Sequence, residues 1–164
     1  MRRSKTAPKP SNPKDAIGST KIPYHVWPEV ATILGAMKML AGALKYGRSN
    51  YRAIGIRATI YTDAIRRHTN DFLEGEDLDP EDGLHHMAGV LASAAIILDA
   101  YYAGKMIDDR MYPGGYKRVR AEMTAAVTRL KKLYAGRNPK HWTIADAPRA
   151  TAGHKRRNTK ESRP

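Results

Sequence analysis

The chain has 164 residues, a formal net charge of +13 and 41% hydrophobic side chains, which suffices for one domain with a core and flanking tails. It contains no cysteine, which excludes disulfides, thiolate metal sites and cysteine nucleophiles. The basic N-terminus leads into prolines rather than an apolar segment, and no apolar stretch reaches the length of a membrane span. We therefore expect a cytoplasmic protein without a membrane partner.

The positive charge is concentrated near the two ends of the chain. Residues 1–22 carry six Lys or Arg and one Asp, and their Pro and Ser content predicts a flexible N-terminal arm. Residues 137–164 are also polar and basic, which predicts a disordered tail. Between them, residues 23–136 are predicted to form one domain. Because residues 23–104 carry more acidic than basic side chains, the folded part is not expected to grip nucleic acid, and the tails are the only candidate sites for such a partner.

The first two helices are predicted from apolar spacing and from the residues that bound them. Pro28-Glu29 begins the first helix and Gly47 ends it. Its apolar positions recur at helical spacing: Val30, Ile33, Leu34, Met37, Leu40, Ala41 and Leu44. The second helix is predicted over about residues 58–74, before Gly75, with the stripe Tyr61, Ala64, Ile65, His68 and Phe72.

Two further helices are predicted after residue 78. Asp79, followed by Pro80 and by an acid at position 82, is typical of a helix N-cap, so the third helix is expected to run from there to about Tyr102. A glycine-rich break at residues 112–115 precedes a fourth helix, over about residues 116–135. No segment shows the alternation typical of strands. The predicted fold class is all-α, with four main helices.

The most informative feature of the sequence is a run of six carboxylates in nine residues, with no basic residue among them: Glu74, Glu76, Asp77, Asp79, Glu81 and Asp82. Carboxylates this close repel one another unless cations, helix N-termini or water stabilise them. The predicted helix start accounts for the last three. The first three crowd the end of the preceding helix, where acids oppose the helix dipole. Clustered carboxylates suit Mg²⁺ or Mn²⁺ bridged to phosphates, and a solvated loop is an equal alternative.

Two histidines and one basic loop lie close to this run in the sequence. His68 lies on the apolar stripe of the second helix, and a histidine at such a position is more often a hydrogen-bonded core residue than a ligand. His86 falls one turn after Asp82 and could be a metal ligand, a phosphate contact or a partner of that acid. Residues 45–52, KYGRSNYR, combine cations with tyrosines, so they either contact phosphate and a base or simply end a helix.

Several segments together resemble a known family. They are residues 12–15, 42–52, 61–68 and the block from Glu74 to His86, in this order over about residues 12–112. They resemble the dATP/dGTP diphosphohydrolase N-terminal domain family of bacteriophages, which is related to the MazG-like all-α nucleotide pyrophosphohydrolases. The resemblance implies a four-helix MazG-like bundle. It also implies hydrolysis of a deoxynucleoside triphosphate, dATP or dGTP, to monophosphate and pyrophosphate with Mg²⁺ or Mn²⁺.

The resemblance also implies roles for particular residues. By motif position the metal ligands are Glu74, Glu76, Asp77, Asp79 and His86. Of these, Glu74 and Glu76 are the candidates for orienting or deprotonating the attacking water. The residues expected to bind substrate are Lys45, Arg48, Asn50, Arg67 and His68.

The sequence departs from the family pattern at three points. The Glu-x-x-Glu and Glu-x-x-Asp signature of MazG-type helices is absent, and Asp71-x-x-Glu74 is its nearest equivalent. Some members have a second histidine where this chain has Gly89, and Asp82 replaces a frequent serine. The resemblance further implies a homo-oligomer, a dimer or a tetramer. Two alternatives stay open: a non-catalytic accessory protein whose basic tails bind nucleic acid or a partner, and an enzyme that releases triphosphate.

Overall fold

The computed structural model describes residues 12–147, so the predictions for residues 1–11 and 148–164 lie outside the described residues. The chain forms two compact units, one ending at Arg110 and the other beginning at Met111. The predicted domain over residues 23–136 includes parts of both units, and its bounds stay a prediction. Each unit is therefore described by itself.

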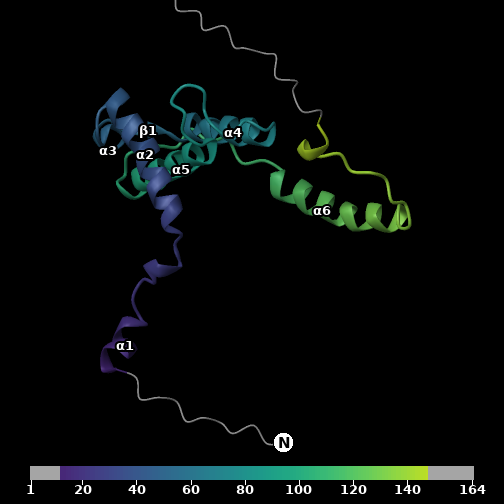
Figure 1. Ribbon diagram of the computed structural model, residues 1–164, viewed down its shortest axis with the longest axis horizontal. Helices are drawn as coiled ribbons and strands as arrows, with labels where there is room; N and C mark the ends of the chain where they lie inside the picture. The colour runs from purple at the N-terminus through teal and green to yellow at the C-terminus, as the bar shows by residue number, and fades with distance from the viewer. Residues whose placement is uncertain (1–11, 148–164) are drawn as a thin grey trace, which may run out of the picture. The chain divides into compact units, whose positions relative to one another are not determined.

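Helices dominate both units (Figure 1). The first unit contains α1 (Pro13–Gly18), the 3₁₀ turn η1 (Tyr24–Val26), α2 (Glu29–Tyr46), α3 (Asn50–Ala53), α4 (Ala58–Leu73) and α5 (His86–Tyr102). It also has two short strands, β1 (Ile56–Arg57) and β2 (Met106–Ile107). The second unit contains α6 (Tyr116–Leu133) and the 3₁₀ turn η2 (Ile144–Asp146). The mostly helical class with four main helices is confirmed, and α1 and η2 give local structure to the predicted arm and tail.

Glycines end two of the main helices where the sequence predicts. Pro28 precedes the first residue of α2, and Gly47, with φ of +87°, follows the last. Helix α4 likewise stops at Glu74 and Gly75, the latter with φ of +94°. Residues that carry a side chain rarely adopt a positive φ, so helices that end in this way usually end at a glycine.

The predicted start of the third helix is wrong, because α5 begins at His86 and not after Asp79. The carboxylates of Asp79 and Asp82 each accept a hydrogen bond from the backbone N–H two residues later, both at 3.0 Å. Such local bonds stabilise turns in competition with a helix. Gly83 then has φ of +72°, which a right-handed helix excludes. The side chain of His85 caps α5 by accepting from the N–H of Met87 at 3.1 Å.

The two short strands were not predicted from the sequence. They pair in parallel, with Ile56 beside Met106 and Arg57 beside Ile107. The N–H of Ile56 donates to the carbonyl of Lys105 at 3.0 Å. Two residues are too few for an alternating pattern to be visible in the sequence.

Helix α5 is the centre of the first unit, since both α4 and α2 pack against it (Figure 1). Its buried residues are small apart from His86: Ala88, Gly89, Ala92, Ser93 and Ala100. Small residues allow helices to approach closely, and a Cβ placed on Gly35 of α2 would already lie 3.0 Å from Leu91. The closely packed part of this unit therefore follows one face of α5.

Much of the apolar face of α2 is exposed in the single chain. Val30 and Ile33 are 68% and 62% exposed, and Met37 and Leu40 are about half exposed. Such a surface is typical of an interaction site and is consistent with the predicted homo-oligomer, which stays a prediction. Among residues 12–147, no helix combines the length and apolar character that crossing a membrane requires.

The close approach at Gly55 gives a test of the strand pair. Gly55 has φ of +94°, and a Cβ there would lie 2.7 Å from the carbonyl oxygen of Lys105. We expect Gly55→Ala to lower the free energy of unfolding by more than the roughly 1–2 kcal/mol of a left-handed backbone alone, because it also separates β1 from β2. Gly104→Ala is the control, since its φ is +65° and a Cβ there meets no atom of residues 12–147 within 4 Å. Equal losses in urea unfolding would contradict this account.

Candidate metal centre and its pocket

Three side chains from separate segments meet at the N-terminal end of α5. They are His68 of α4, Asp79 of the loop and His86 of α5, and each offers a ligand atom within 4.8 Å of the others. His86 is 2% exposed and Asp79 is 9% exposed. Burial of the His86 imidazole and the Asp79 carboxylate beside a second, partly buried imidazole is costly unless these groups share a proton or a cation. The group is therefore a candidate metal centre.

The two imidazoles face each other through the same ring position. The Nδ1 atoms of His68 and His86 lie 3.0 Å apart, so one donates to the other unless both direct lone pairs at a cation. Burial, and then the Lys38 ammonium, lower the pKa of His68. A lowered pKa keeps this imidazole neutral, which a metal ligand requires.

The second ring nitrogen of His86 lacks a hydrogen-bond partner among residues 12–147. This atom, Nε2, is buried. The carboxylate of Glu76 lies 3.8 Å away, beyond hydrogen-bond distance. Histidine ligands of metals usually direct their second N–H at a carboxylate, and Glu76 stands in that direction from the His86 ring. The residues therefore fit a divalent metal ion.

The loop between α4 and α5 holds this arrangement through its backbone. The N–H of His86 donates to the carbonyl of Asp77 at 2.9 Å, and the N–H of Asp79 donates to the carbonyl of Leu84 at 2.8 Å. Leu78 and His85 also form an isolated antiparallel bridge. The loop is thus closed on itself, and it presents Asp79 beside the first residue of α5.

A glycine of α5 makes room for His68. A Cβ built on Gly89 would lie 2.5 Å from the Nε2 atom of His68 and within 3.0 Å of two of its ring carbons. The imidazole of His68 therefore occupies the space that any side chain at position 89 would need. The departure from the family pattern at Gly89 has a physical consequence: it brings α4 close enough for the two histidines to meet.

Two lysines of α2 bind the acidic loop. Lys38 donates to Asp79 at 2.8 Å and to Asp82 at 2.7 Å, and Lys45 donates to Glu81 at 2.6 Å. These three acids were predicted to stabilise a helix start, and instead they bind cations of a neighbouring helix. Burial opposes the charge on Lys38, but its hydrogen bonds to the two carboxylates outweigh that effect and raise its pKa. Although burial alone would raise the pKa of Asp79 and Asp82, the Lys38 ammonium lowers both.

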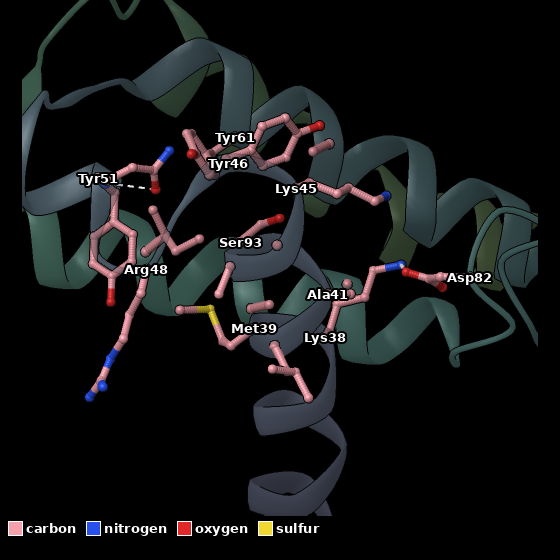
Figure 2. A pocket seen from close by; sticks show the side chains of 18 of the residues that line it. Lys38, Met39, Ala41, Lys45, Tyr46, Arg48, Tyr51, Tyr61, Asp82 and Ser93 are labelled. Carbon is pink, nitrogen blue, oxygen red and sulfur yellow. Dashed lines mark hydrogen bonds and ion pairs between the residues drawn. The ribbon is translucent and has the colours of Figure 1, made fainter.

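A pocket of about 900 Å³ adjoins the centre. It is lined by predicted substrate-binding residues and by tyrosines: Lys45, Arg48, Asn50, Arg67, His68, Tyr46, Tyr51 and Tyr61. Figure 2 shows Lys38 reaching Asp82 toward one end and Arg48 and Tyr51 toward the other. Arg52 binds Asp99 through two hydrogen bonds of 2.7 and 2.5 Å, and this ion pair joins the α3 wall of the pocket to α5.

The predicted metal ligands divide between this centre and the surface. Asp79 and His86 belong to the candidate centre, whereas Glu74 is exposed at the end of α4 and Asp77 is exposed in the loop. Glu76 is partly buried beside His86. No ion pair to Glu74 or Asp77 occurs within residues 12–147. The ligand set as a whole stays a prediction.

Two features of the centre were not predicted from the sequence. His68 was predicted to bind substrate, and it both lines the pocket and belongs to the metal group. Lys38 was not selected at all. Its signal was a cation beside the apolar stripe of α2, seven residues before Lys45 and so on the same helical face.

Comparisons with known proteins bear on the same region. Residues 11–110 match the model of a family described as dATP/dGTP diphosphohydrolase, N-terminal. A protein of Salmonella phage PMBT28 named dATP/dGTP diphosphohydrolase is 31% identical over 94 residues, which are 57% of this chain and 30% of that relative. The match thus spans less than a third of the relative's length. No solved structure matches the chain.

The contact between Gly89 and His68 gives a test of the centre. We expect Gly89→Ala to weaken Mn²⁺ binding by at least about tenfold, as loss of a supporting contact does at metal sites, because the new methyl group displaces the His68 ring. The measurement is calorimetric titration with Mn²⁺, with circular dichroism to confirm the helices.

Gly42→Ala is the matched control for this substitution. Gly42 is also a helical glycine, but a Cβ there meets no atom of the described residues within 4 Å, so this variant should bind Mn²⁺ as the parent protein does. Unchanged affinity in both variants would show that the spacing between α4 and α5 does not shape the site.

Proposed function

The chain belongs to the dATP/dGTP diphosphohydrolase N-terminal family, and from this premise we propose that it is a metal-dependent nucleoside triphosphate pyrophosphohydrolase. Its proposed substrates are purine deoxynucleoside triphosphates, and its products the monophosphate and pyrophosphate. The observation that carries the proposal is that the candidate metal centre and the pocket share His68 and Asp79. A polyphosphate in the pocket would therefore reach the metal ligands.

The donor set bears on the choice of ion. Two imidazoles and one carboxylate would hold it: His68, Asp79 and His86. Imidazole is a typical ligand of transition metals, whereas Mg²⁺ prefers oxygen ligands. Of the two ions expected, the residues thus favour Mn²⁺. Such an ion would neutralise charge on the phosphates and polarise the attacked group.

Basic side chains of the pocket would bind the phosphates. Lys45, Arg48 and Arg67 line it, and cations of this kind form charge-assisted hydrogen bonds with phosphate oxygens. Lys45 is bound to Glu81, but the glutamate side chain is 68% exposed, so a phosphate can replace it at little cost. The pocket tyrosines offer aromatic faces on which a base can stack.

Glu76 is the proposed general base. Within residues 12–147 its one ionic neighbour is His86, so its carboxylate is not bound by the lysines that hold Asp79, Glu81 and Asp82. In the proposed reaction a water oxygen bonds to the α-phosphorus while Glu76 takes its proton. The bond between that phosphorus and the α–β bridging oxygen breaks, and pyrophosphate leaves.

The activity is tested with each deoxynucleoside triphosphate in the presence of Mn²⁺ or Mg²⁺, with products separated by ion-exchange chromatography. We expect dATP and dGTP to give monophosphate and pyrophosphate, His86→Ala to abolish turnover, and Lys117→Met in the second unit to leave it unchanged. Release of triphosphate would contradict the reaction. Absence of turnover with every nucleotide would favour a non-catalytic protein that binds through its basic tails.

The role of Glu76 has its own test. We expect Glu76→Gln to lower kcat by about 10²- to 10⁴-fold, the usual contribution of a general base, because the amide cannot accept the proton. Mn²⁺ affinity should fall by no more than about 10- to 100-fold, the usual cost of losing a carboxylate behind a histidine ligand, so kcat is compared at saturating Mn²⁺ as established by calorimetry. Full turnover under these conditions would refute the assignment of Glu76 as the base.

A further inference from the structure

The Lys38 ammonium lies between two carboxylates in a position that a metal ion could also occupy. Its Nζ atom is 2.8 Å from Oδ2 of Asp79 and 2.7 Å from Oδ2 of Asp82. The Lys38 side chain is 12% exposed, and the two acids are 13% and 14% exposed. The other oxygen of each carboxylate accepts a backbone N–H. The two free oxygens therefore converge on one point, which a cation must fill.

This cation position adjoins the candidate metal centre. Oδ2 of Asp79 binds Lys38 and also lies 4.0 Å from Nδ1 of His68. One carboxylate oxygen thus binds Lys38 and also faces the imidazole of His68. In centres that bind two metal ions, neighbouring ions clamp the reacting phosphate from two sides. Here one of two adjoining cation positions already holds a charged side chain.

We propose that the Lys38 ammonium permanently fills the second cation position, so that the chain binds one divalent ion and Lys38 supplies the second positive charge to the phosphates. Two of the three N–H groups of Lys38 bind Asp79 and Asp82, and the residue lines the pocket. The third N–H is therefore available to a phosphate oxygen. This proposal rests on the proposed metal site and not on the identity of the nucleotide.

An ordinary structural salt bridge is the competing explanation of Lys38. A salt bridge of this kind would fix the loop on α2 without limiting the number of ions. The two explanations differ when the ammonium is removed. If Lys38 fills a cation position, the converging carboxylates become an oxygen site for a hard ion. If it is only a tether, its removal loosens the loop and creates no site.

The experiment counts Mn²⁺ ions per chain without nucleotide, by the electron paramagnetic resonance signal of free Mn²⁺ during titration. We expect one ion in the parent protein, two in Lys38→Met, and one in Lys105→Met, an exposed lysine of the same unit. A count of two or of none in the parent would overturn the proposal. So would a count of one in Lys38→Met. A full count of ions without turnover of any nucleotide would refute the proposed function alone.

Loss of Lys38 also leaves two carboxylates facing each other, which could unfold the variant. The proposal then predicts that millimolar Mn²⁺ restores the helical circular dichroism signal of Lys38→Met, because the ion replaces the missing charge. Lys38→Arg should keep the parent's count of one, because it retains the charge. Failure of Mn²⁺ to restore an unfolded Lys38→Met, or a second ion in Lys38→Arg, would count against the proposal.

Discussion

The site depends on how closely α4 can approach α5. Gly89 has no side chain, and the ring of His68 fills that space, with its Nε2 atom 2.5 Å from where a Cβ would stand. This contact brings the two imidazoles to 3.0 Å. Apart from His86, the buried residues along α5 are all small. These small residues set the geometry of the polar site, although their own side chains are not part of it.

Lysines of α2 stabilise the acidic run at residues 74–82. Lys38 and Lys45 bind three of its six carboxylates, and this charge balance is the condition under which Asp79 can be buried. The remaining three acids do not bind these lysines. Asp77 contributes its backbone carbonyl to His86, Glu76 lies beside that imidazole, and Glu74 ends α4 in water.

The sequence predicted those features that depend on neighbouring residues alone, such as the ends of α2. The helix ends at Pro28 and Gly47 follow from backbone chemistry and were correct, and the family resemblance was confirmed. The start of α5 was wrong because Asp79 and Asp82 satisfy turns as well as helix caps, and only contact with Lys38, 41 residues away, decides between them. The role of His68 depends on Gly89, which lies on another helix. Such pairings are tertiary, and the sequence does not show which residues become partners.

The central claim is that the divalent ion binds between the histidines and not at the exposed start of the acidic run. The most direct measurement is anomalous diffraction at the manganese edge from crystals grown with Mn²⁺. The account predicts a peak in contact with His68, Asp79 and His86, beside an ammonium that still bridges Asp79 and Asp82. A peak at Glu74 and Asp77, with neither imidazole among its ligands, would contradict it.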